Sequence, residues 1–162
     1  MPIIASDGNA LQLLRKEFPT LPHLVLPSYD ISYSKNIKWN LILQLPKIWL
    51  AVQKEQKTIA QYIQHDKTIV GIISDNRFGV LNSKIPSVYI THQINVLSGF
   101  TSFFASKIHQ KIIRKFNECW IPDNEQVPFS GKLSTFKNTK INAQYIGVLS
   151  RFKKEQLPLK VD

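Results

Sequence analysis

The sequence predicts an α/β fold, specifically a Rossmann-like three-layer domain with a mostly parallel sheet. The first observation is a pair of short apolar runs, Ile69–Ile73 and Val88–Ile90, which are rich in β-branched residues and apolar on both faces. Such runs are typical of parallel strands buried between helices. The second observation is that helical and strand patterns alternate along the chain, which favours helices layered on a parallel sheet. The 162 residues suffice for one domain with its own core.

The first half of the chain is expected to hold two short strands and two helices. Asp7 or Asn9 can cap the first helix, and Pro19 and Pro22 end it. In chain order, we expect a strand at Ile3–Ser6, a helix from Asp7 or Asn9 to Phe18, a strand at His23–Leu26, a loop at 27–40, and a long helix that begins at Leu41 or Pro46 and ends near Gln64.

In the second half, the two apolar runs supply the third and fourth strands. Ser98 can cap the helix that follows them. We then expect a helix over Gly99–Phe116, a strand at Cys119–Ile121, a polar loop at 122–142, a strand at Gln144–Leu149, and a charged tail at 151–162. The expected order is β-α-β-α-β-β-α-β-β, with one domain over residues 1–150 and a linker over 151–162.

Composition argues against several classes of protein. No run of about 18 apolar residues occurs, so no membrane span is expected. No basic-then-apolar start with a cleavage site is present, which predicts no secretory signal. The single cysteine, Cys119, cannot form an internal disulfide and fits a reducing cytoplasm. The four histidines form no ligand cluster, so we expect no metal site.

The chain is strongly basic, with 21 basic and 11 acidic side chains and a formal net charge of +10. Such a charge attracts polyanions, either nucleic acid or an anionic membrane surface. Lysine-rich surfaces also serve solubility alone, and that alternative stays open.

Polar residues gather where the two apolar runs end. Ligands of open α/β sheets bind outside the carboxyl ends of the strands. The candidates at these ends are Asp75, Asn76, Arg77, His92, Gln93 and Asn95. No G-x-G-x-x-G occurs, so the dinucleotide-binding fingerprint is absent.

The segment His92–Gly99, with the sequence HQINVLSG, resembles a turn of known glycosyltransferases. It is similar to the H-E-Q-N-x-x-x-G turn in the amino-terminal, acceptor-side domain of GT-B glycosyltransferases, above all the peptidoglycan N-acetylglucosaminyltransferase that acts on an undecaprenyl-linked acceptor. His92, Asn95 and Gly99 match this pattern, whereas Gln93 and Ile94 depart from it. Ile4–Gly8 resembles the second strand and turn of such domains, and Tyr145–Leu149 resembles the strand that leads to the donor-binding half.

The resemblance implies a fragment of a metal-independent, cofactor-free enzyme that moves a sugar from a nucleotide-sugar donor to an acceptor hydroxyl. The family's first strand and glycine-rich acceptor loop would precede Met1, and the donor half would follow Asp162, so this chain alone is expected to be inactive. The implied location is cytoplasmic, peripheral on the inner face of the membrane. His92 or Asp75 would act as the base, with acceptor contacts from Asn95, Ser98, Gly99 and Arg77.

Each candidate residue also has a purely structural interpretation. His92 and Asn95 can hold their own turn, and Asp75–Arg77 has common turn chemistry. Ser98 can cap a helix whose free N–H groups would otherwise suit a diphosphate. These alternatives stay open.

The helix that begins at Gly99 combines aromatic and basic side chains. Phenylalanine beside lysine is typical of helices that lie on a membrane surface. The residues expected on this face are Phe100, Phe103, Phe104, Lys107, Lys111, Arg114 and Lys115, whereas Ile108, Ile112 and Phe116 are expected to point toward the core. The alternative function is a non-catalytic basic module that binds nucleic acid or a protein. Nucleic acid is the weaker interpretation because the sequence lacks the aromatic-basic pattern of an RNA-recognition sheet and the helix-turn-helix and zinc-finger spacings.

The resemblance also raises a question about the sheet. In such domains, the first strand lies between the strand that corresponds to Ile3–Ala5 and the strand that ends at Asp75. Its absence would leave unpaired backbone groups. We expect the Ile3 strand to move into the central place, with a strand-exchanged homodimer as the alternative.

Overall fold

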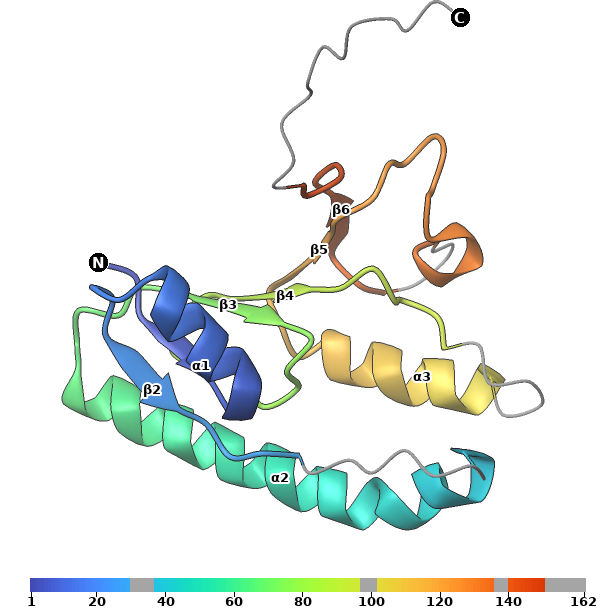
Figure 1. Cartoon of the computed structure of the whole chain (residues 1–162). Helices are drawn as coiled ribbons and strands as arrows, with labels where there is room; N and C mark the ends of the chain where they lie inside the picture. The colour runs from blue at the N-terminus through green and yellow to red at the C-terminus, as the bar shows by residue number, and fades with distance from the viewer. Residues whose placement is uncertain (30–36, 97–101, 136–139, 151–162) are drawn as a thin grey trace, which may run out of the picture.

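The computed structural model describes residues 1–29, 37–96, 102–135 and 140–150 (Figure 1). It is an α/β structure of parallel strands flanked by helices, which confirms the predicted fold class and the predicted order of elements. The elements are β1 (Ile4–Ser6), α1 (Gly8–Glu17), β2 (His23–Val25), α2 (Ile37–His65), β3 (Ile72–Asp75), β4 (Ser87–Ile90), α3 (Ser102–Ile113), β5 (Glu118–Ile121), the 3₁₀ turn η2 (Gly131–Leu133) and β6 (Ala143–Tyr145).

The strands form two separate parallel sheets. One has four strands in the order β3-β4-β5-β6, and the other pairs β1 with β2. The registers align Ile72 with Ser87 and Cys119 with Ala143 in the larger sheet, and Ile4 with His23 in the smaller one. No pairing joins β1 to β3 among the described residues.

The expectation that the first strand closes the sheet is therefore wrong. β1 stays with β2, held by hydrogen bonds from Ile4 N to Pro22 O and from Leu26 N to Ser6 O, each 2.9 Å long. Moving β1 beside β3 would break this pairing and pull Ala5 away from the core beneath it. A gap consequently remains between the two sheets.

Two apolar clusters hold the layers together. Figure 1 shows α2 and α3 on the same side of the four-stranded sheet. The cluster at α3 contains Tyr89, Ile94, Ile113, Phe116, Cys119, Ile121 and Ile141. The cluster at α2 contains Leu26, Ile59 and Val80, with Ala5, Leu24, Ile63 and Ile72 packed around it. Connections between parallel strands are right-handed. The chain steps from β1 outward to β2 through α1, and then back past β1 to β3 through α2. Because these two steps run in opposite directions, α1 and α2 lie on opposite faces.

Several element boundaries differ from those predicted. α2 begins at Ile37 and contains Pro46 in its interior. α3 ends at Ile113 instead of Phe116. The last strand ends at Tyr145 because Gly147 has a positive φ of 80°, which breaks the extended run, so Val148 and Leu149 are exposed.

Two of the predicted features lie outside the part of the chain that the structure describes. The predicted start of α3 at Ser98–Gly99 and the predicted linker at 151–162 fall outside the described residues. Among the helices that the structure describes, none is long and apolar enough to cross a membrane.

Candidate active site

Asp75 and His92 lie at the carboxyl edge of the larger sheet. Asp75 is the last residue of β3, and His92 follows the end of β4 by two residues. The two strands are neighbours, with Asp75 in register with Ile90, and Asn76 N donates a 3.2 Å hydrogen bond to Ile90 O. Both side chains are exposed. The sheet therefore presents a carboxylate and an imidazole at adjacent strand ends, the place where ligands of open α/β sheets bind.

The turn after β3 is fixed by its own polar groups. Asn76 adopts a left-handed conformation with φ 52°, which asparagine tolerates better than most residues. Ser74 Oγ donates a 2.6 Å hydrogen bond to Arg77 O across the turn. These contacts show that Asp75–Arg77 forms a turn, which was the structural alternative to a role of these residues in a site.

Each of the three guanidinium nitrogens of Arg77 has a partner within the protein. Its Nη1 donates to Asp7 at 2.6 Å, its Nη2 donates to Pro27 O at 2.8 Å, and its Nε contacts Glu55. Partial burial lowers the pKa of Arg77, but hydrogen bonding and charge attraction to Glu55 and Asp7 more than offset this and raise it. Arg77 thus ties the ends of β1 and β2 to α2, and a phosphate would have to compete with these three contacts.

Glu55, on α2, is the buried centre of this arrangement and was missed by the sequence analysis. Its side chain is fully buried and accepts hydrogen bonds from Arg77, the Tyr29 hydroxyl and Gly79 N. Burial, followed by the hydrogen bond to Glu55, raises the pKa of Tyr29 well above its usual range. The guanidinium of Arg77 also lies 5.0 Å from the centre of the Tyr29 ring. One carboxylate therefore organises the carboxyl ends of three strands.

Asn95 is occupied in holding its own loop. Its amide nitrogen donates to Lys132 O at 2.9 Å and to Thr135 O at 2.6 Å, and its oxygen accepts from Gln110 at 3.3 Å. The backbone N–H groups of Ile94 and Asn95 both donate to Leu133 O. The structure therefore gives Asn95 a structural role beside the candidate base.

Asp123 is a second buried carboxylate that the sequence analysis missed. It is 1% exposed and accepts hydrogen bonds from the N–H groups of Asn124, Phe129 and Ser130 and from Ser134 Oγ. These bonds, that from Ser134 first, hold the pKa of Asp123 well below its usual range. The side chain of Asp123 fixes the loop that follows β5. The Asp123-Asn124 pair just after this strand is typical of turns and was the sequence signal that could have indicated this role.

The predicted surface face of α3 is partly described. Phe103 is 61% exposed, and Lys107 Nζ lies 4.2 Å from the centre of its ring. Lys107, Lys111, Arg114 and Lys115 are all exposed. Phe100, Ser98, Gly99 and the side chain of Phe104 lie outside the described part of the chain.

Ile108 was expected to point into the core, and this was wrong. It is 55% exposed because the buried face of α3 carries Ile113 instead. The exposure of Ile108 beside Lys107 and Lys111 adds an apolar side chain to the basic face.

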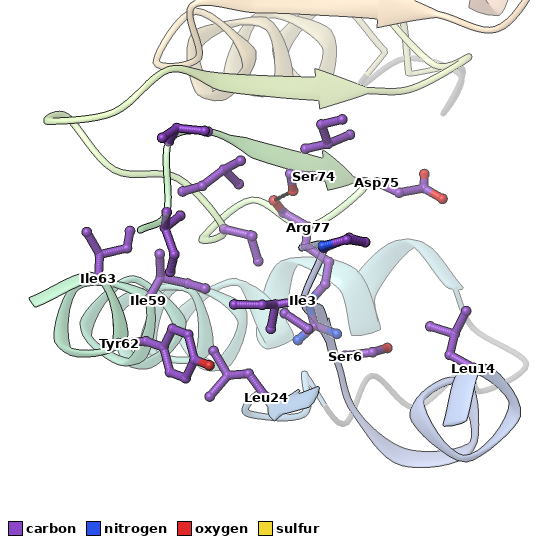
Figure 2. Close-up of a pocket in the computed structure, with 18 of the residues that line it drawn as sticks. Ile3, Ser6, Leu14, Leu24, Ile59, Tyr62, Ile63, Ser74, Asp75 and Arg77 are labelled. Carbon is purple, nitrogen blue, oxygen red and sulfur yellow. Dashed lines mark hydrogen bonds between the residues drawn. The ribbon is translucent and has the colours of Figure 1, made fainter. Parts of the chain in front are cut away.

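A cavity of about 600 Å³ opens in the gap between the two sheets (Figure 2). Figure 2 shows Asp75 and Arg77 at its β3 side, Ser6 and Leu14 on the side of β1 and α1, and Ile59 and Ile63 rising from α2. The lining is largely apolar, with polar groups at the carboxyl ends of the strands and at Tyr62 and Thr68. Within the described residues, no three His, Cys, Asp or Glu side chains come together in a way that would hold a metal ion.

No protein-family model, curated protein sequence or solved structure matches the chain. Any function must therefore be argued from the residues and their placement.

Proposed function

We propose that this chain is the acceptor-side domain of a GT-B glycosyltransferase, which in a longer polypeptide moves a sugar from a nucleotide-sugar donor to an acceptor hydroxyl. The observation that carries the proposal is the pair of exposed side chains, Asp75 and His92, at adjacent carboxyl ends of parallel strands. His92 also opens the HQINVLSG segment, whose resemblance to the family's turn supplies the reaction.

The chemistry assigned to this edge is proton removal. His92 or Asp75 takes the proton from the acceptor hydroxyl as its oxygen attacks the anomeric carbon. The bond from that carbon to the nucleoside diphosphate breaks, and the diphosphate leaves with the bonding electron pair. No metal enters this scheme, and the groups that stabilise the leaving diphosphate belong to the donor-binding half.

In this proposal, Arg77 and Asn95 hold the backbone around the two candidate bases in place. Arg77 fixes the ends of the neighbouring strands through Asp7, Pro27 and Glu55. Asn95 fixes the loop beside His92. Ser98 and Gly99, which lie outside the described residues, keep their proposed role as an anion contact.

The basic face of α3 supports an acceptor at a membrane surface. Phe103 and Ile108 offer exposed apolar side chains next to Lys107 and Lys111. Each basic residue near an anionic surface contributes on the order of 1 kcal/mol. The proposed acceptor is therefore lipid-linked, and the enzyme would bind the inner face of the membrane peripherally.

The test uses a longer polypeptide that contains the donor-binding half and transfers a sugar to a lipid-linked acceptor. His92→Ala should lower kcat by roughly 100- to 10,000-fold, the usual cost of losing a general base, and should change donor binding much less. His65→Ala is the matched control because His65 is an exposed histidine at the far end of α2.

Equal activity of the His92→Ala and His65→Ala enzymes would assign His92 to the structure of its turn. Absence of transfer by every longer polypeptide, together with salt-sensitive binding of the chain to RNA or DNA, would instead support the basic nucleic-acid-binding module.

A further inference from the structure

The inner face of α3 contacts the His92 loop, residues 91–96, which follows β4 (Figure 1). Ser106 Oγ accepts a 2.9 Å hydrogen bond from Val96 N and donates one of 3.3 Å to Val96 O. One turn farther along the helix, Gln110 Nε2 donates a 3.3 Å hydrogen bond to Asn95 Oδ1. Two successive turns of α3 therefore hold the loop that carries one of the two candidate bases.

The ring of His109 lies on the same face of α3 as these two contacts, because residues 106, 109 and 110 are neighbours at helical spacing. It packs edge-on to two aromatic rings, with centroids 5.4 Å away at Phe78 and 6.4 Å away at Tyr89. The Nδ1 atom of His109 is buried without a hydrogen-bond partner, as is the hydroxyl of Tyr89. A proton on Nδ1 would place a positive charge among apolar groups, with no acceptor in contact, and such a charge is costly.

Among the described residues, the groups around this ring offer no negative charge in compensation. On β5, burial raises the pKa of Cys119 to about 12, and on β4, burial raises the pKa of Tyr89 above its usual range, so both groups stay neutral. On α3 itself, Lys107 and Lys111 are positively charged and would repel an imidazolium. Phe78, which supplies the contact from the turn after β3, is apolar.

We propose that His109 is a positioning residue for the His92 loop and acts as a pH-dependent switch. With a neutral His109, α3 stays packed on the loop and holds it through Ser106 and Gln110. With a protonated His109, the helix loses this packing and releases the loop. The consequence for sugar transfer rests on the proposed function, whereas the switch itself is a property of the fold.

The direction of the pH effect follows from the surroundings of His109. Burial lowers its pKa, and hydrogen bonding to the backbone of Ile94 offsets this only in part. On the His92 loop, His92 is exposed, so solvent screens its charge. As the pH falls below the ordinary histidine pKa of about 6.5, the released state takes up a proton before the packed state does. The packed state therefore loses stability on acidification and is favoured above about pH 6.5.

The experiment measures amide hydrogen exchange in the 162-residue chain at about pH 7.5 and about pH 5, corrected for the intrinsic effect of pH on exchange. Protection of the Asn95 and Val96 amides, which donate to Leu133 O and Ser106 Oγ, should fall by about fivefold or more on acidification. The Leu26 amide, bonded to Ser6 O in the smaller sheet, is the internal reference and should change much less.

A pair of histidine variants assigns the effect to one ring. His109→Phe keeps an aromatic side chain in the cluster but cannot be protonated, so the protection of the His92 loop should no longer depend on pH. His65→Phe replaces an exposed histidine at the end of α2 and should leave the pH dependence unchanged. NMR titration of the unaltered chain supports the test even if His109→Phe fails to fold, because the His109 ring should titrate below about pH 6.5.

Three results would overturn the proposal. One is titration of His109 at or above about pH 6.5. Another is the same pH-dependent loss of protection in the His109→Phe variant as in the unaltered chain. The third is an equal loss at Leu26, which would mean that acid unfolds the whole molecule and not the contact between α3 and the His92 loop. None of these measurements needs a sugar donor, so absence of transfer by the longer polypeptide would contradict the proposed function and leave this switch untouched.

Discussion

At position 79 the chain has no room for a side chain. A Cβ built on Gly79 would lie 2.6 Å from Glu55 Oε2 and 2.7 Å from Val52 O, so a methyl group collides with a buried carboxylate and with helix backbone. Gly79→Ala should therefore lower the free energy of unfolding by about 1–3 kcal/mol. Gly71→Ala is the control, since its Cβ meets only Pro86 O at 3.7 Å. Urea unfolding of both variants measures the difference, and equal stability would show that Glu55 is not fixed against this turn.

Asp123 gives the protein a predictable response to acid. Its pKa is lowered in the folded state, so its contribution to stability is complete above the unfolded pKa of about 3.9 and is lost as pH falls toward the lower folded value. Asp123→Asn should lower Tm at neutral pH, and the difference from the unaltered protein should shrink between about pH 5 and pH 3. Thermal unfolding followed by circular dichroism at several pH values measures this.

The control for this prediction is Glu125→Gln, which removes an exposed carboxylate from the same loop. If the Tm difference caused by Asp123→Asn stayed constant from pH 6 to pH 3, about the range in which carboxylates titrate, the low pKa of Asp123 would be contradicted.

Single residues were the hardest part to predict from the sequence. The pattern placed Asp75 and His92 at strand ends, because only one residue separates each of them from an apolar run. It could not place the partners of Asn95, because Lys132 and Thr135 are about forty positions away and meet it only through the fold. Glu55 was missed for a similar reason: a glutamate in a long helix is usually solvated, and its burial depends on Arg77 and Tyr29.

At the scale of elements, Arg77 joins β1, β2 and α2 around the buried Glu55. Arg77→Met should lower the free energy of unfolding by about 3–5 kcal/mol, because it leaves Glu55 buried without its cationic partner. Lys84→Met, an exposed residue in the same β3–β4 connection, should change stability by less than about 0.5 kcal/mol. Chemical denaturation of the two variants compares these effects. Similar values would mean that Glu55 gains another partner when Arg77 is lost.

The exposed face of α3 leads to a prediction about membranes. Changing Lys107, Lys111, Arg114 and Lys115 to glutamine should weaken binding to vesicles that contain anionic lipid by about 1 kcal/mol per residue, with the fold unchanged. Sedimentation with such vesicles at low salt measures this binding. The matched control changes four exposed lysines on other surfaces to glutamine: Lys16, Lys67, Lys84 and Lys132.

The control removes the same charge, so it separates a local surface from net charge. Equal loss of vesicle binding in the two quadruple variants would assign the attraction to the overall charge of +10 and remove the special role of α3.

Element types were predictable, but several boundaries were not. Short β-branched runs and alternation were sufficient for β3 and β4, since both strands are bounded by polar turns. The end of β6 depends on the backbone of Gly147 at φ 80°, a conformation that composition alone does not reveal. Ile108 was assigned to the core because its spacing fitted the helix, yet the sheet meets a different face, on which Ile113 is buried.

The molecule as a whole is divided by the gap between its sheets. The order of elements could be predicted because each strand and helix has a local pattern, whereas strand pairing depends on contacts between distant segments. Arg77 and the packing on α2 keep the two sheets in one body, even though no strand hydrogen bonds connect them within the described residues. The same arrangement leaves the carboxyl edge, where Asp75 and Arg77 lie, open at the mouth of the cavity.

The 162-residue chain is expected to be inactive by itself. The proposed function assigns the donor and the stabilisation of its leaving diphosphate to a separate half of the enzyme, so a base at His92 or Asp75 has no activated sugar to act on. The purified chain should therefore show no transfer from radiolabelled nucleotide sugars to a lipid-linked acceptor, while a longer polypeptide with the donor half transfers under the same conditions. The His92→Ala form of the longer polypeptide distinguishes catalysis from contamination. Turnover by the 162-residue chain that is lost on His92→Ala would show that it carries its own donor site, and the assignment as one half of an enzyme would then be wrong.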